Sequence, residues 1–349
     1  MLALQAVTPA DLVCAVPGVT LAEARKMIAA VHRGEPVVAS SAVRRSAASA
    51  VTAAGERPRL AVEAETASAI DPFVKYLLAA PDGARFEAVR IPLEHPGRVT
   101  VCVSSQVGCA LACAFCATGR LGLARNLAAW EIVEQVRVVR AHLPADGAGV
   151  RVHGVVFQGM GEPLANLDAV LQAIRVFSEP CALGIDARAI TVCTAGLPSG
   201  IRRLAAEAPR VRLGVSISSA IAAHRRAVMP IAERHDLDDV IAAAADHARA
   251  TGLAPMWAVT LLAGVNDGDA DAEALAARAV AFHAATGVRP RLSLLDYNPI
   301  GDGDRFVRSP RMAAFRAGLS AAGLASHRRY SGGSDVAAAC GQLASTGGV

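Results

Sequence analysis

Four cysteines lie close together in one stretch, CVSSQVGCALACAFCATG at residues 102–119, and three of them have the spacing CxxxCxxC. These three, Cys109, Cys113 and Cys116, follow a short segment with the composition of a β-strand. Because the loop that carries them is short, their sulfur atoms can converge on one centre. Thiolates are preferred ligands of zinc and of iron–sulfur clusters, so the stretch predicts a metal centre.

The residues around this loop bear on which metal centre it holds. Structural zinc takes four protein ligands, commonly from two separated cysteine pairs, and the sequence has no second pair. Three thiolates suit a 4Fe-4S cluster with one open iron, where a substrate can bind and an electron can be delivered. Cys102 lies within the preceding predicted strand, so we expect only Cys109, Cys113 and Cys116 to hold the cluster.

The elements that must position this loop alternate from residue 99 onward. Short β-branched runs predict strands at 99–103, 154–157, 190–193, 211–216, 256–262 and 291–295. Amphipathic stretches between them predict helices at 128–143, 167–178, 237–252 and near 270–285. Such a βαβ series forms a parallel sheet with its ligand site at the carboxyl ends of the strands. We therefore expect an α/β protein with a partial (β/α)6 barrel and not a closed barrel of eight strands.

The chain before this core has a different composition. Helical periodicity at 20–34 and 67–80 favours a small, mainly helical accessory domain over residues 1–85, followed by the core at 86–349. Basic side chains of this region can bind phosphate groups, although an ordinary solvated surface carries such charges too. They are Arg25, Lys26, Arg33, Arg44, Arg45, Arg57 and Arg59.

Composition and charge exclude several classes of protein. Hydrophobic residues make up 53% of the 349 residues, but charges interrupt every apolar run before it reaches the length of a membrane helix. The first basic residue is Arg25, so the amino terminus lacks the basic front of a secretory signal. Eight cysteines in a chain of this length do not form a disulfide scaffold. We expect a cytoplasmic monomer with no membrane partner, and the net charge of +4 is weak evidence for a polyanionic one.

Four stretches together carry a resemblance to a known family. The CxxxCxxC spacing with an aromatic residue before the last cysteine resembles the radical S-adenosylmethionine (SAM) superfamily. With FQGMGEPLANLDAVL (157–171), LLDYNPIG (294–301) and DVAAACGQL (335–343), the cysteine stretch is similar to the dual-cysteine RNA methyltransferases of the RlmN/Cfr family. The resemblance implies methylation of an adenosine ring carbon, C2 more than C8, in ribosomal RNA and in some members transfer RNA. It also implies a 4Fe-4S cluster, two SAM molecules per turnover, and a flavodoxin-like or other reductant.

The same resemblance implies residues that bind SAM. Glu162 in GMGEP would bind the methionyl amine, and Gly161 would let the backbone approach the ligand closely, although a glycine-rich turn is by itself equally a structural feature. The other implied contacts come from Cys193, Ser216, Ile217, Ser218 and Asn298. Cys193 replaces a serine and Ser218 replaces a histidine of the family, so these two positions offer poorer hydrogen bonding.

Three further residues are implied to do chemistry. A lone cysteine in an alanine-rich run usually fills a core, but the matched ACGQL context makes Cys340 the carrier whose thiolate accepts a methyl group from one SAM. A 5'-deoxyadenosyl radical made from the second SAM would activate that methyl group for addition to adenine. Cys102 would then release the RNA by forming a disulfide. Glu87 in FEAVRIP is the implied base, with Glu94 as a competitor and a solvated surface carboxylate as the alternative interpretation of Glu87.

Two other functions remain open from the sequence. A radical SAM enzyme that acts on a peptide or small molecule would have the same cluster, but it would need neither Cys102 nor Cys340. A non-catalytic iron–sulfur or zinc module that binds RNA would need only the cysteine loop and the basic region. The pairs Arg225/Arg226 and Arg328/Arg329 can contact RNA phosphate, and Cys14 and Cys181 match no motif.

Overall fold

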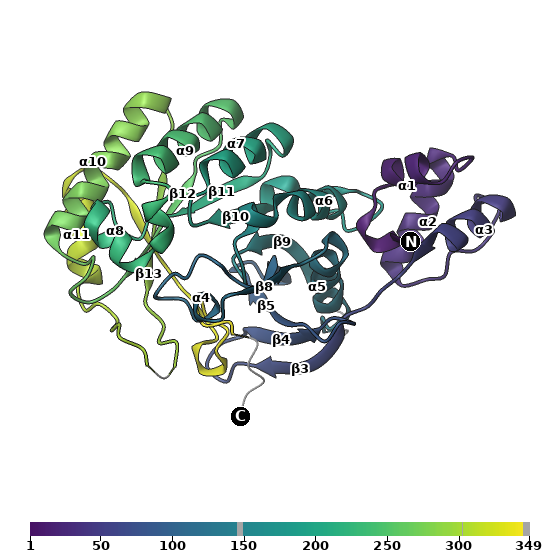
Figure 1. The fold of residues 1–349 in the computed structure, drawn as a ribbon, viewed down its shortest axis with the longest axis horizontal. Helices are drawn as coiled ribbons and strands as arrows, with labels where there is room; N and C mark the ends of the chain where they lie inside the picture. The colour runs from purple at the N-terminus through teal and green to yellow at the C-terminus, as the bar shows by residue number, and fades with distance from the viewer. Residues whose placement is uncertain (145–148, 302, 345–349) are drawn as a thin grey trace.

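The centre of the molecule is one large twisted sheet (Figure 1). The computed structural model describes residues 1–144, 149–301 and 303–344. Within these ranges, ten strands pair in the order β14-β13-β12-β11-β10-β9-β6-β5-β4-β3. Neighbouring strands from β6 to β14 are parallel, whereas β3, β4, β5 and β6 pair antiparallel. No pairing between β3 and β14 occurs in the described part of the chain, so the barrel is partial, as predicted.

The predicted parallel strands are confirmed, with small changes at their ends. They are β6 (Arg98–Val103), β9 (Arg151–Phe157), β10 (Ile190–Thr194), β11 (Arg212–Ser216), β12 (Met256–Leu261) and β13 (Arg291–Asp296), joined at the edge by β14 (Ser326–Arg329). The helices that alternate with them are α5 (Ala129–Ala141), α6 (Leu167–Ser178), α7 (Pro198–Glu207), α8 (Ala222–Val228), α9 (Leu237–Thr251), α10 (Asp269–Thr286) and α11 (Met312–Ala321).

The apolar pattern of each helix explains how it packs on this sheet. In α6 the buried side chains Leu167, Val170, Leu171 and Ile174 recur at helical spacing and form one stripe. This stripe belongs to the main hydrophobic core, together with strand residues such as Val155. None of the described helices is long and apolar enough to cross a membrane.

The amino-terminal residues form a separate helical cluster (Figure 1). Helices α1 (Pro9–Ala15), α2 (Leu21–Arg33) and α3 (Arg45–Ala54) pack around their own small apolar core. Helices α1 and α2 each begin at a threonine with a capping box, which satisfies the first backbone N–H groups.

The helix predicted over residues 67–80 is wrong. This region contains the end of β3 (Ala61–Ala67), a loop, and β4 (Val74–Ala79), and both strands join β5 (Arg85–Pro92) at the edge of the main sheet. The apolar run in β4 is too short for periodicity to distinguish a buried strand from a helix. The boundary at residue 85 remains a prediction, and the strands on its amino-terminal side pair with the core sheet.

Candidate active site

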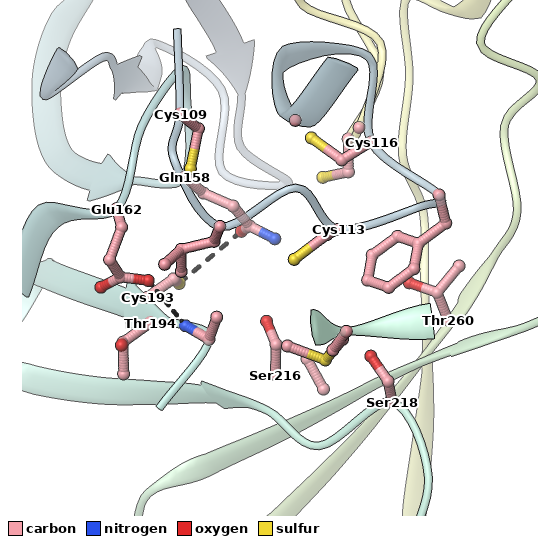
Figure 2. Close-up of a pocket in the computed structure, with 18 of the residues that line it drawn as sticks. Cys109, Cys113, Cys116, Gln158, Glu162, Cys193, Thr194, Ser216, Ser218 and Thr260 are labelled. Carbon is pink, nitrogen blue, oxygen red and sulfur yellow. Dashed lines mark hydrogen bonds between the residues drawn. The ribbon is translucent and has the colours of Figure 1, made fainter. Parts of the chain in front are cut away.

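The cysteine loop lies over the carboxyl ends of the parallel strands. Cys109, Cys113 and Cys116 line a cavity, here called the first cavity, with residues from the ends of β9 to β13 (Figure 2). The N–H of Cys109 donates to the carbonyl of Gly122 at 2.7 Å, and the N–H of Cys116 donates to the carbonyl of Cys113 at 3.1 Å. These backbone bonds fold the loop so that all three thiols face the same space.

The donor set of the first cavity bears on which metal centre it can hold. Burial raises the pKa of the three thiols, in Cys109 to about 11. Among the described residues, no three His, Cys, Asp or Glu side chains lie close enough to share a single metal ion. A zinc ion requires such convergence, whereas each thiolate of a four-iron cluster binds a different iron. The three thiols that line one cavity are a donor set that fits an iron–sulfur cluster.

Glu162 enters the first cavity from the turn after β9 (Figure 2). Its Oε1 accepts the N–H of Leu164 at 3.0 Å and its Oε2 accepts the N–H of Ala195 at 2.8 Å. Burial raises the pKa of this carboxyl to about 7. Gly161 lines the cavity with a φ of 98°, and a Cβ there would lie 2.8 Å from the backbone nitrogen of Gln106. The close approach that this glycine permits is therefore to the protein's own chain.

Three of the other residues predicted to bind SAM also line the first cavity. They are Cys193 at the end of β10, Ser216 at the end of β11, and Ser218, which has a left-handed φ of 57°. The thiol of Cys193 donates to Oε1 of Gln158 at 3.7 Å, and burial raises its pKa to about 12. Gln158, Thr194 and Thr260 complete the polar wall, and sequence motifs did not single them out (Figure 2).

The remaining two predicted contacts, Ile217 and Asn298, are not among the residues that line this cavity in the described chain. Ile217 is fully buried in the main hydrophobic core. Nδ2 of Asn298 donates to the carbonyl of Cys340 at 3.2 Å and to Oγ of Ser331 at 3.3 Å. Their contacts with SAM remain predictions.

Cys340 lies in a wall that two cavities share. It lines the first cavity, and it also lines a second cavity together with Cys102, Arg329 and Gln158. Burial raises the pKa of the Cys102 thiol, and the Arg329 guanidinium opposes this shift. All eight cysteines are free, so the implied disulfide between Cys102 and Cys340 is not formed in this structure.

Comparisons with known proteins agree with this geometry. No family model matches the chain. A protein of Sorangium cellulosum named "Probable RNA methyltransferase" is 61% identical over 347 residues, which cover 94% of this chain and 88% of that protein. The "Dual-specificity RNA methyltransferase RlmN" of Syntrophobacter fumaroxidans is 43% identical over 270 residues, which cover 77% of this chain and 75% of that protein. The chain belongs to the RlmN family of radical SAM RNA methyltransferases.

A solved structure supports the same family for the whole chain. The crystal structure of a radical SAM methyltransferase from Sphaerobacter thermophilus is 34% identical and has a TM-score of 0.86, covering 99% of this chain and all of that one. The predicted resemblance, the α/β partial barrel and the methyltransferase activity of this RlmN-family enzyme are thereby confirmed.

In this RlmN-family enzyme, Glu87 lies inside the protein and not on a solvated surface. It is 1% exposed in β5, whereas Glu94 is exposed. Its Oε1 lies 3.1 Å from Nζ of Lys75, and its Oε2 accepts the N–H of Ala344 at 2.9 Å. It is not among the residues that line either cavity in the described chain, and its role as a base remains a prediction.

Arg225 of the RlmN-family enzyme has a different role from the one considered for it. It is 1% exposed, so the expectation that it contacts RNA phosphate is wrong. Its guanidinium donates to the carbonyls of Ser216 and Ala195, each at 2.7 Å, and to that of Ile217. Arg225 thus ties together the segments that follow β10 and β11 and form one wall of the first cavity. An arginine pair in a helical sequence gives no signal of such burial.

Proposed function

We propose that this enzyme methylates a ring carbon of adenosine in RNA, C2 in preference to C8, with Cys340 as the methyl carrier and Cys102 as the resolving thiol. The observation that carries this proposal is the position of Cys340 between the two cavities, with Cys102 in the second. A methyl group can be loaded on Cys340 from the first cavity and can meet both the RNA base and Cys102 from the second. Ribosomal RNA is the proposed substrate, with transfer RNA as a further one.

The first cavity supplies the groups for the proposed cofactors. Cys109, Cys113 and Cys116 would hold a 4Fe-4S cluster, and the Glu162 carboxylate would bind the ammonium group of SAM. When bound, the cluster supplies the electron for reductive cleavage of SAM, after a flavodoxin-like or other reductant has reduced it. Two SAM molecules are consumed per turnover, one as methyl donor and one as radical source.

The cysteines perform the transfer and the release. The adenine carbons C2 and C8 are electron-poor, so a direct displacement on a sulfonium methyl group is not open to them. The Cys340 thiolate accepts the methyl group instead and forms a thioether. Joining of the activated carbon to the base leaves one unpaired electron, which the oxidised cluster would accept; Sγ of Cys102 then attacks Sγ of Cys340. The S–S bond forms as the bond from Cys340 Sγ to that carbon breaks, the carbon takes up a proton, and Glu87 is the proposed base for the ring proton. A thiol reductant must then reduce the disulfide.

The experiment that tests this function combines labelled methyl donor with two cysteine variants. Anaerobically purified enzyme is incubated with reductant, methyl-labelled SAM and a ribosomal RNA transcript, and the RNA is digested to nucleosides for mass spectrometry. We expect label in 2-methyladenosine. Cys102→Ala should trap RNA covalently bound to the protein, whereas Cys340→Ala should give neither label nor adduct. Cys14→Ala is the control, because this thiol is exposed and lies in neither cavity.

Three results would contradict parts of the proposal. Label in 8-methyladenosine would assign the reaction to C8. Free, unmodified RNA from both Cys102→Ala and Cys340→Ala would contradict the division of labour between the two thiols. Production of 5'-deoxyadenosine without RNA methylation would favour a radical enzyme with a peptide or small-molecule substrate.

A further inference from the structure

The segment that leads into Cys340, residues 330–340, is tied to the loop between β3 and β4. Asp71 of this loop accepts two hydrogen bonds on Oδ2, from Oη of Tyr330 at 2.7 Å and from the N–H of Gly333 at 2.8 Å. These bonds connect residues about 260 positions apart in the chain. A carboxylate that accepts two bonds holds its donors more firmly than a neutral acceptor does.

The same loop contacts the segment at two further points. Asp335 accepts hydrogen bonds from Oγ of Ser68 at 2.7 Å and from the N–H of Ala69 at 2.8 Å. The rings of Phe73 and Tyr330 meet edge to face, with centroids 6.1 Å apart. A Cβ at Gly332 would lie 2.5 Å from the Phe73 ring, so the segment passes against the loop where only glycine fits.

The conformation of the segment requires such external support. Gly333 and Ala337 are both in the left-handed region, with φ values of 75° and 52°. Alanine adopts this conformation only at a cost of roughly 1 kcal/mol, and persists there when its surroundings fix it. The loop that contains Asp71 contacts the segment before Ala337, at Tyr330, Gly333 and Asp335.

The support reaches Cys340 through Ser331. The N–H of Cys340 donates to Oγ of Ser331 at 2.8 Å, and Asn298 donates to the carbonyl of Cys340. Ser331 lies between Tyr330 and Gly333, the two residues that Asp71 holds. The position of Asp71 is therefore transmitted to the backbone that presents the thiol to both cavities.

We propose that Asp71 is a positioning residue for the methyl carrier: it fixes residues 330–333 so that Cys340 stays in the wall between the two cavities. This inference rests on the proposed function of Cys340. A carrier must meet a methyl donor, an RNA base and Cys102 in turn. Its backbone therefore has to be held at a position from which the thiol reaches both cavities. Without Asp71 the segment would leave this position for a larger share of the time.

The test uses the full-length, anaerobically purified enzyme and a matched control. Asp82→Ala is the control, because Oδ1 of Asp82 accepts the N–H of Ala84 at 3.1 Å just as Oδ1 of Asp71 accepts that of Phe73 at 3.1 Å. Both aspartates are in hairpin loops beside β4, but the side-chain partner of Asp82 is Arg125, outside the Cys340 segment. Tyr330→Phe is a milder variant, which removes one hydrogen bond and retains the ring contact.

Four quantities are measured for each protein: the amide exchange rate, the alkylation rate, kcat and KM for RNA. For Asp71→Ala we expect amide exchange in residues 330–344, and alkylation by iodoacetamide of the Cys340 thiols that carry no methyl group, to be about tenfold faster than in Asp82→Ala, as the loss of two bonds to a carboxylate implies. We expect kcat for RNA methylation to fall about tenfold with KM for RNA unchanged. Tyr330→Phe should give intermediate values.

The results that would contradict the role of Asp71 can be distinguished from those that would contradict the proposed function. Exchange and alkylation rates in Asp71→Ala equal to those in Asp82→Ala overturn the inference, and if Asp71→Ala does not fold, wild-type rates in Tyr330→Phe overturn it. Because these two rates are measured without RNA, a wild-type enzyme that methylates no adenosine contradicts the proposed function while the rates still decide the role of Asp71.

Discussion

At the scale of single residues, Glu162 shows how the fold changes the chemistry of a side chain. It is buried, and among the described residues no cationic side chain is identified as a partner of its carboxylate. Its hydrogen bonds to backbone N–H groups favour the ionised form, but burial outweighs them and raises the pKa to about 7. An arriving ammonium group would supply the missing opposite charge.

We predict that the affinity for SAM depends on pH through this carboxyl. Glu162 takes up a proton as the pH falls through its pKa of about 7, and the neutral acid cannot pair with an ammonium group. Binding should therefore be about tenfold weaker at pH 6 than at pH 8, measured by calorimetry on the anaerobic enzyme. Glu162→Gln should bind weakly at both pH values. An unchanged pH dependence in this variant would assign the effect to another group.

From the sequence, residues of the site could be predicted only where they belong to a recognisable motif. The spacing of the cysteines and the acid in GMGEP identified Cys109, Cys113, Cys116 and Glu162 as residues of one site, and the structure places all four in the first cavity. Gln158 lies in the FQGMGEP stretch but was not predicted as a site residue, and Arg329 was considered only as an RNA phosphate contact; the cavities that they line were found only in the structure. Burial of Glu87 likewise depends on strand pairing, which the local sequence does not specify.

At the scale of elements, Arg225 of α8 holds two strand ends in place. It donates to the carbonyl of the last residue of β11 and to that of the residue after β10, and burial lowers its pKa to about 10, which leaves it charged at neutral pH. The adjacent Arg226 is exposed. The two arginines therefore offer a comparison within one helix.

We predict that Arg225→Met lowers the free energy of unfolding by about 3 kcal/mol or more, because it leaves buried carbonyl groups without donors. Arg226→Ala should change it by less than about 0.5 kcal/mol. Urea unfolding of the two variants measures both values. Equal stabilities would show that the carbonyls find other donors.

The elements themselves were predicted best where the apolar pattern is long. Helix α6 matches its predicted range, since apolar side chains recur along its 12 residues and face the sheet in one stripe. Strand β14 has the sequence Ser-His-Arg-Arg, which has no apolar residue and gives no strand signal. Strand β4 has the sequence Val-Lys-Tyr-Leu-Leu-Ala, whose short hydrophobic pattern fits a helix and a buried strand equally well.

At the scale of the whole molecule, the amino-terminal helices are attached to the outside of the core. Their small core is distinct from the main one, and Nε2 of Gln172 on α6 donates to the carbonyl of Ala6 at 2.7 Å. Arg25 and Lys26 are exposed on α2. Strands β3 to β5 extend the same sheet as the barrel strands through successive antiparallel pairings of β3 with β4, β4 with β5 and β5 with β6, which the apolar pattern did not predict.

We predict that the exposed basic residues of α2 contribute to RNA affinity but not to methyl loading. Combined Arg25→Glu and Lys26→Glu substitutions should weaken RNA binding and reduce the slope of log affinity against log salt by about 1 to 2, as loss of one or two phosphate contacts implies. Fluorescence anisotropy titrations at salt concentrations from about 50 to about 200 mM measure this slope. Arg249→Glu on α9 controls for the change of charge. Equal slopes in wild type and double variant would place RNA elsewhere.

The most direct test of the central claim is mass spectrometry of the peptide that contains Cys340, from protein expressed and purified without oxygen. We predict one added methyl group on Cys340 and none on Cys14. An unmodified Cys340 in a preparation with an intact cluster and ample SAM would contradict the role of this thiol as the methyl carrier.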